Sequence, residues 1–300
     1  MTSFLSDATR TFQMNFADEF SYRVWRDAKL DMYPRQVEEL FVDIGGLGRL
    51  EDTEIAAIIS NCTRFNMAIY RCRDGFVDRA AVRAFAANFG LHRLDHHLCA
   101  NDDGVSELSV ASTGTQAGYV PYSDRSLSWH TDGYYNAKSQ QVRAVILHCA
   151  ANADAGGENA LLDPEIAYIH LRDENPGFIN AFEHPECMTI PANADEHGEI
   201  RPTVSGPVFT RDPNSGVLHM RYSARKKNIR WREDGLTRAA LDFLSEFLAD
   251  ENGPVLRYRL QPGEGLISNN VLHNRTAFKD SPSRVRLLFR ARFIDRIESS

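Results

Sequence analysis

The spacing of hydrophobic residues changes along the chain, from a helical period near the N-terminus to the alternating period of strands further on. Apolar residues between positions 37 and 44 recur at i, i+3, i+4 and i+7, and this stripe stops at Gly45-Gly46. A second short helix is expected over residues 52–60. We therefore predict that residues 1–62 form a mainly helical N-terminal extension.

The rest of the chain mixes strands with helical insertions. Strands are predicted over residues 65–72, 142–149, 155–162, 217–222, 255–260, 266–273 and 285–294. Helices are predicted over residues 78–89, 163–173 and 237–249. Residues 100–118 and 174–216 are rich in turn-forming residues and are expected to be loops, the second with short strands. Since no repeat and no long linker interrupts this order, a single domain over residues 1–300 is the simplest interpretation.

Composition narrows the class of protein. Hydrophobic residues make up 43% of the chain and charged residues 25%, which is typical of a globular protein. A net charge of −7 argues against nucleic acid as a partner. No apolar run approaches the roughly 20 residues of a membrane span, and no secretory signal is visible. The 5 cysteines are scattered, which favours reduced thiols in the cytoplasm. The sequence does not decide whether the chain forms a homo-oligomer.

The stretch at residues 126–136 carries the candidate chemistry. His130 and Asp132 lie two residues apart where an extended run gives way to a glycine-containing turn. Side chains at i and i+2 of an extended chain point to the same face, so an imidazole and a carboxylate can converge on one ion. With one more histidine they would form the facial triad of non-heme Fe(II) oxygenases. The same His-x-carboxylate pattern also occurs at His184 and at His197.

Two alternatives compete with this pair. His92, Asp95 and His96 would share one face of a helix, but the segment follows a glycine stop, so we expect a loop there. His148 lies in a buried-type strand and is interpreted as a core residue. A barrel of strands brings residues that are far apart in sequence to one mouth, so the third ligand is expected far downstream.

His273 is the favoured third ligand because arginines follow it on or just before the next strand. Arg284, Arg286 and Arg290 occupy this region, and a buried arginine there would bind a carboxylate through a forked hydrogen bond. His219 is also followed by arginines, but they belong to the basic run at residues 221–232, which is expected to be a solvated face.

Four short motifs, in this order and spacing, resemble one enzyme family. They are Trp-His-Thr-Asp-Gly at 129–133, Gly-Gly-Glu-Asn at 156–159, Leu-His-Asn-Arg at 272–275 and Arg-Leu-Leu-Phe-Arg at 286–290. Over residues 30–295 the chain is similar to the taurine dioxygenase family of Fe(II)/2-oxoglutarate-dependent oxygenases, which includes γ-butyrobetaine hydroxylase-like enzymes. The resemblance implies a mainly β fold with helices: a double-stranded β-helix, the cupin-like jelly roll, with N-terminal helices and a helical insertion.

The resemblance also implies roles for individual residues. His130, Asp132 and His273 would hold Fe(II), and Arg286 would bind the far carboxylate of the cosubstrate 2-oxoglutarate, with Arg284 as the alternative. Arg290 would face the substrate. Where the family often has Thr or Ser, this chain has Asn159, whose amide can still donate a hydrogen bond to the cosubstrate.

The expected reaction uses O₂ and 2-oxoglutarate, releases succinate and CO₂, and hydroxylates or oxidatively cleaves an unactivated C–H bond. The expected substrate is a small charged molecule that resembles an amino acid, a betaine or a sulfonate. Arg290 suits an anionic group, whereas Tyr122, Tyr134 and Tyr135, with Tyr119, would suit a quaternary ammonium through cation–π contact. Two alternatives are a jelly-roll metalloenzyme that does not use 2-oxoglutarate and a non-catalytic ligand-binding module.

Overall fold

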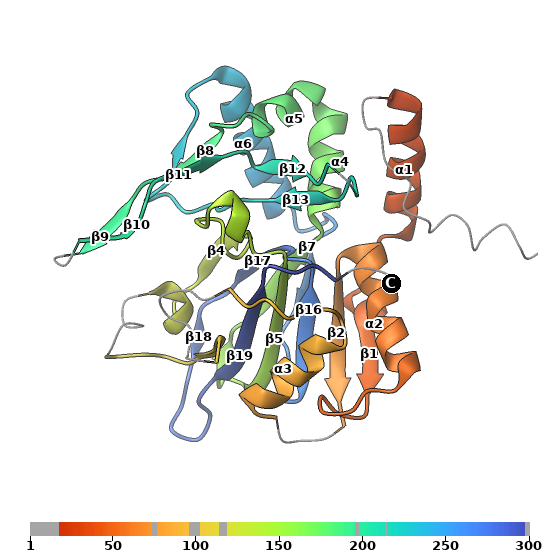
Figure 1. Cartoon of the computed structure of the whole chain (residues 1–300), viewed down its shortest axis with the longest axis vertical. Coiled ribbons are helices and arrows are strands. Elements are labelled where there is room, and N and C mark those ends of the chain that lie inside the picture. Colours follow the sequence, from red (N-terminus) through yellow and green to blue (C-terminus); the bar gives the residue numbers. More distant parts are fainter. Residues whose placement is uncertain are drawn as a thin grey trace, which may run out of the picture.

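Two β-sheets face each other and enclose the main hydrophobic core (Figure 1). The structure is a computed structural model that describes residues 18–73, 77–95, 103–113, 119–195, 198–213 and 215–297. The larger sheet has six strands in the order β1-β2-β16-β5-β19-β3 and the smaller has four in the order β15-β7-β17-β4. The sheets do not close into a barrel, and the architecture is the predicted jelly roll with helical additions.

The larger sheet separates two apolar clusters because its side chains alternate between its faces. Its strands are β1 (Phe41–Ile44), β2 (Met67–Cys72), β3 (Val105–Leu108), β5 (Ala144–Ala151), β16 (Glu264–Ser268) and β19 (Leu287–Phe293). On β19, Phe289, Ala291 and Phe293 pack on the outer face, whereas Leu288 points into the core between the sheets. Arg290 and Arg292 share the parity of Leu288, and this alternation aims them into the interior.

Helices α2 (Asp52–Phe65) and α3 (Arg79–Ala87) cover the outer face of the larger sheet (Figure 1). A capping box at Glu51 begins α2, and Asn66, in the left-handed conformation, ends it. Asp78 caps α3 by accepting a hydrogen bond from the amide of Ala81, as the sequence predicts.

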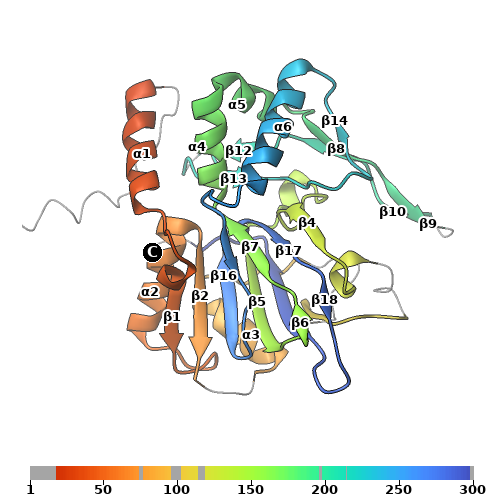
Figure 2. The same cartoon turned by 180° about the vertical axis from the view of Figure 1, so that it is seen from behind.

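The smaller sheet consists of β4 (Leu127–His130), β7 (Asn159–Leu162), β15 (Leu256–Tyr258) and β17 (Leu272–Arg275) and is seen from behind in Figure 2. Its inward side chains, such as Leu161 and Leu272, meet Leu147 and Leu266 of the larger sheet. Two-residue strands β6 (Ala155–Gly156) and β18 (Phe278–Lys279) pair beside it. Short 3₁₀ turns are η1 (Val37–Leu40), η2 (Val120–Tyr122) and η3 (Lys138–Gln140).

The long insertion between β7 and β15 lies at one end of the two sheets (Figure 1). Its helices are α4 (Pro164–Glu174), α5 (Pro176–Phe182) and α6 (Gly235–Ala249), and α1 (Glu19–Met32) lies beside α4. Its strands are β8 (Met188–Ile190), β9 (Asn193–Asp195), β10 (Gly198–Arg201), β11 (Val204–Gly206), β12 (Phe209–Arg211), β13 (Leu218–Met220) and β14 (Arg230–Trp231). Asp163 caps α4 and Pro164 occupies its first turn, as predicted.

Three local predictions are wrong. Residues 41–44, expected in a helix, form β1, because they pair in parallel with β2 and their β-branched residues fit a sheet edge. Residues 105–108, expected in a loop, form β3 on the free edge of β19. Residues 176–182, expected in loops and short strands, form α5, which Asn175 caps and Pro176 opens.

The described part of the chain contains no helix long and apolar enough to cross a bilayer. The core between the sheets also includes residues of α1 and of the insertion. The division of the chain into domains stays a prediction, and residues 1–17 of the N-terminal extension lie outside the described residues.

Candidate metal centre

The pairing of β4 with β17 brings the two halves of the candidate site together. In the register of these strands His273 lies directly opposite His130, and the ring centroids are 4.3 Å apart. Immediately after β4 the chain turns at Gly133, whose φ of +67° is left-handed and where a Cβ would lie only 2.4 Å from Val142. Glycine is needed here for both reasons, and the turn carries Asp132 back toward the two rings.

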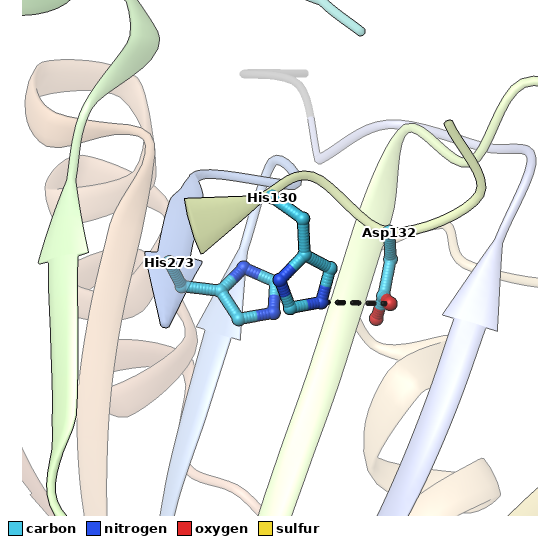
Figure 3. Close-up of side chains that lie close together, drawn as sticks. All are labelled: His130, Asp132 and His273. Carbon is cyan, nitrogen blue, oxygen red and sulfur yellow. Dashed lines mark ion pairs between the residues drawn. The ribbon is translucent and has the colours of Figure 1, made fainter. Parts of the chain in front are cut away.

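Three ligand-type side chains converge at this point (Figure 3). One atom from each of His130, Asp132 and His273 lies within 4.8 Å of the others, and all three residues are buried. Among the described residues, this is the group of histidine, cysteine and carboxylate side chains that could hold a metal ion. The sequence prediction that these three residues meet is therefore consistent with the geometry.

Each imidazole is oriented by a carbonyl of its own strand. His130 Nδ1 lies 2.8 Å from the Ser128 carbonyl, and His273 Nδ1 lies 2.8 Å from the Val271 carbonyl. A carbonyl can only accept, so each Nδ1 carries the hydrogen and each Nε2 presents a lone pair. Burial, with the nearby His273, lowers the pKa of His130 to about 3, which keeps this ring in the neutral form that binds metals.

Asp132 is ionised in a buried position because arginines face it. Burial alone would raise the pKa of its carboxyl group, but the charges of Arg290 and Arg292 outweigh burial and hold the pKa well below its usual range. Asp132 Oδ1 lies 3.5 Å from Arg290 Nη1 and 3.9 Å from Arg292 Nη1. Asp132 Oδ2 is buried without a hydrogen-bond partner, and a metal ion would fill that need.

Arg286 is buried immediately before β19, whereas Arg284 is exposed in the preceding turn. The Arg286 guanidinium lies 4.9 Å from the centre of the Phe278 ring, and its Nη1 has no hydrogen-bond partner. Burial lowers its pKa to about 10, so the side chain still carries its charge at neutral pH. Between the two arginines that the sequence offered, only Arg286 presents a buried, unpaired donor.

Tyr134 and Tyr135 follow the metal-centre turn and contact arginines. The Tyr134 hydroxyl accepts a hydrogen bond from Arg225 at 3.1 Å, and the Tyr135 hydroxyl accepts one from Arg292 at 2.9 Å. The other candidates lie elsewhere: Tyr122 is buried in the main apolar core, Tyr119 is 41% exposed, and Asn159 is buried on β7 opposite Arg275 of β17.

The competing histidines lie in other surroundings. Asp95 is ion-paired with Arg292, His92 is exposed, and His96 lies outside the described residues. His184 Nδ1 accepts a hydrogen bond from the Glu186 amide, and His197 also lies outside the described residues. His148 is a buried core residue beside Tyr70, as predicted.

Burial, with the charges of Arg296, Arg143 and Arg221, lowers the pKa of His219, on β13, to about 3. In the basic run, Arg221 is not solvated as expected, because its guanidinium is buried and donates to the carbonyls of residues 134, 188, 204 and 206.

Sequence reasoning missed Arg292, Asp95 as its partner, and Asn270. Arg292 follows Arg290 by two residues on one strand, so the period of the strand placed it on the same inward face. The Asp95–Arg292 ion pair joins residues nearly two hundred positions apart, and no local sequence pattern predicts it. Asn270 hydrogen-bonds the backbone of Asp132, a contact that likewise depends on tertiary structure.

Known proteins share this fold and this sequence pattern. The family of taurine catabolism dioxygenases TauD and TfdA matches residues 70–292. A uridine-5′-phosphate dioxygenase from Streptomyces sp. is 29% identical over 220 residues, which cover 70% of this chain and 77% of that protein.

Solved structures are similar in fold. A taurine dioxygenase from Burkholderia xenovorans is 20% identical, with a TM-score of 0.56 over 85% of this chain and 87% of that one. An asparagine oxygenase, solved with Fe(II), 2S,3S-3-hydroxyasparagine and succinate, is 14% identical, with a TM-score of 0.54 over 92% of each chain. Since the family match spans most of the chain, this protein belongs to the TauD/TfdA family and is an Fe(II)/2-oxoglutarate-dependent dioxygenase.

Proposed function

We propose that this enzyme oxidises a C–H bond of a small anionic molecule, with uridine 5′-phosphate as the first candidate. His130 and His273 would bind Fe(II) through Nε2, and Asp132 through its carboxylate. Arg286 would bind the far carboxylate of 2-oxoglutarate. When bound, the iron and the cosubstrate activate O₂ and release succinate and CO₂; the chain supplies orientation, charge and the exclusion of water.

The residues fit these roles through atoms that are otherwise unpaired. Asp132 Oδ2 and Arg286 Nη1 are both buried and without a hydrogen-bond partner. Buried polar atoms of this kind are rare in folded proteins, because each costs about 1–3 kcal/mol. A metal ion at Asp132 and a carboxylate at Arg286 would remove both costs.

The observation that carries the substrate class is the pair Arg290 and Arg292 beside Asp132. Before a metal binds, these two guanidinium groups balance the carboxylates of Asp132 and Asp95. A divalent cation adds two positive charges, and the chelating carboxylate of 2-oxoglutarate offsets one. One positive charge remains on the substrate side, and an anionic group of the substrate would neutralise it.

Arg290 is the residue that we assign to this anion. Its Nε is buried without a partner, and its nearest ion-pair contact, with Asp132, is long at 3.5 Å. Arg292, in contrast, is already held by Asp95 and Tyr135. Phosphate, sulfonate and carboxylate groups all match a guanidinium fork.

The arrangement of the tyrosines disfavours a betaine. A quaternary ammonium would need the ring faces of Tyr134 and Tyr135, but positive charge already lies beside both residues. The Tyr134 hydroxyl accepts a hydrogen bond from Arg225, and the Tyr135 hydroxyl accepts one from Arg292. The Arg201 guanidinium lies 5.9 Å from the Tyr135 ring centre. A cationic substrate group would therefore meet like charges.

The relative named for uridine 5′-phosphate directs the choice of the first substrate. Purified protein with Fe(II) and 2-oxoglutarate would be offered uridine 5′-phosphate, uridine, taurine, asparagine and glycine betaine, and succinate would be measured. We expect at least one anionic compound to stimulate succinate release above the rate without substrate, and we expect uridine 5′-phosphate to exceed uridine. Stimulation by betaine alone would contradict the proposal.

We propose that this reaction takes place in the cytoplasm, because an odd number of widely scattered cysteines suits a reducing compartment.

A further inference from the structure

Asn270 occupies an unusual backbone position next to the metal centre. Its φ is +56°, in the left-handed region, and only 2% of its surface is exposed. Asparagine tolerates this conformation better than most residues, because its short side chain can hydrogen-bond locally. The residue lies two positions before β17, the strand that carries His273.

The Asn270 side chain holds the backbone of Asp132 at two points. Its Oδ1 accepts a hydrogen bond from the Asp132 amide at 2.7 Å, and its Nδ2 donates to the Asp132 carbonyl at 2.9 Å. Nδ2 also donates to the Val142 carbonyl at 2.6 Å. Both hydrogens of the amide are used, and the peptide groups on either side of Asp132 are fixed.

Residues 270–273 also orient the ring of His273. Val271, the next residue, provides the carbonyl that binds His273 Nδ1 at 2.8 Å. Residues 270–273 therefore fix the backbone of one candidate ligand, orient the ring of a second and contribute that ring. In addition, Val142 packs against Gly133 in the turn after Asp132, so its link to Asn270 ties the turn to the segment that leads into β5.

We propose that Asn270 is a positioning residue that sets the separation of Asp132 from His273 and thereby the affinity for the metal ion. The proposal rests on the metal centre assigned above. Neither variant used below can supply the same contacts. Aspartate, which has the same length, lacks the two N–H donors, and glycine has no side-chain amide. Groups that orient metal ligands from behind typically contribute tenfold to a hundredfold in metal affinity.

The test compares Asn270→Gly with Asn66→Gly. Glycine adopts a left-handed backbone without strain, so both changes remove an amide and leave the local conformation accessible. Asn66 is the matched control because it too is a buried asparagine with left-handed backbone, at φ +58°, and its amide contacts Asp163, Asn269 and Arg296 rather than a candidate metal ligand. Asn270→Asp is a second variant that keeps the side-chain size if Asn270→Gly does not fold.

Co(II) is the probe, titrated into metal-free protein and followed by its visible absorption, and thermal unfolding is recorded in parallel. We expect Asn270→Gly and Asn270→Asp to bind Co(II) at least tenfold more weakly than wild type, with an altered absorption spectrum at saturation. Asn66→Gly should lower the melting temperature while its Co(II) affinity and spectrum match those of wild type.

The outcomes separate the two proposals. Wild-type protein that binds no Co(II) would overturn the metal centre itself. Wild-type binding with unchanged affinity and spectrum in both Asn270 variants would leave the metal centre standing and show that Asn270 serves the fold alone.

Discussion

Two buried clusters of charged residues differ in how completely their atoms are paired. The α1 lysine cluster consists of Lys29, Asp163 and Glu165. Lys29 Nζ lies 2.7 Å from Asp163 Oδ2 and 2.6 Å from Glu165 Oε2, and it donates to the Arg64 carbonyl at 2.7 Å. Three oxygens therefore surround the three donors of the ammonium group, and the cluster ties α1 to α4 and to the end of α2.

The metal-centre cluster consists of Asp132, Arg290 and Arg292, and it is incompletely paired. Its Asp132–arginine distances are 3.5 and 3.9 Å, and Asp132 Oδ2, Arg290 Nε and Arg292 Nε are buried without hydrogen-bond partners. Both clusters are buried. Asp163 Oδ2 also makes no hydrogen bond, but it lies 2.7 Å from the Lys29 ammonium group, whereas the shorter of the two contacts between Asp132 and an arginine is 3.5 Å. The difference teaches that a tightly ion-paired buried cluster supports the fold, whereas a loosely paired one is prepared for a ligand.

The largest expected effect is that of His273→Ala. This change removes a ligand that no neighbour can replace, so metal binding and metal-dependent succinate formation should fall below detection, by more than about a thousandfold. Titration with Co(II) and a succinate assay would measure both. His148→Gln is the control, because His148 is also a buried histidine, on β5 of the larger sheet. A normal metal affinity in His273→Ala would refute the site.

Lys29→Met should have the opposite profile. It leaves two buried carboxylates without their cation, so the free energy of unfolding should fall by about 3–5 kcal/mol. Metal affinity, measured on the folded protein, should not change. Urea unfolding would measure the loss, with Arg23→Met as the control, because Arg23 is exposed on the same helix and pairs with exposed Glu19. A loss of metal affinity in Lys29→Met would break the distinction between the clusters.

Arg286→Met should affect the cosubstrate rather than the metal. The concentration of 2-oxoglutarate for half-maximal rate should rise about tenfold to a hundredfold, as expected from losing a charged hydrogen bond of about 1.5–3 kcal/mol. Stability should be unchanged or higher, since a buried unpaired charge is removed. Arg284→Met, at an exposed position, is the matched control, and the reverse result would assign the cosubstrate to Arg284.

The smallest expected effect concerns how the free energy of unfolding changes at acid pH. It involves His148, a buried ionisable residue that belongs to neither cluster. Burial lowers the pKa of His148 to about 4, from an ordinary value of 6.5 that the unfolded chain retains. The unfolded state therefore binds the proton first, so the contribution is complete above pH 6.5 and is lost as the pH falls toward 4, by about 2 kcal/mol at pH 5. His148→Gln should flatten this decline in urea unfolding at pH 8 and pH 5, and an equal decline in both proteins would exclude His148 as its source.

Much of the fold could be predicted from the sequence because its signals are local. Asp78 and Asp163 mark helix starts, and the alternation around β19 marks a strand, so these elements follow from neighbouring residues alone. Strands β1 and β3 could not be predicted in this way, since they are short edge strands whose pairing partners are distant in sequence. Tertiary pairing decided their conformation against the local pattern.

The candidate site likewise contains residues that the local sequence predicts and contacts that depend on tertiary structure. His130 and Asp132 could be found from their spacing, and His273 from the arginines that follow it. The contacts that orient them could not, because the Asp95–Arg292 pair and the Asn270–Asp132 hydrogen bonds join segments far apart along the chain. Arg292 is the exception, since its parity with Arg290 was available in the sequence.

The direct opposition of His130 and His273 on neighbouring strands has a consequence for how the enzyme is assembled. The hydrogen-bond ladder that joins β4 to β17 aligns the two rings, so the sheet itself would build the proposed metal site. Folding and iron loading can then be separate events. Newly made protein would mature in iron-poor conditions and become competent later, when ferrous ion is supplied.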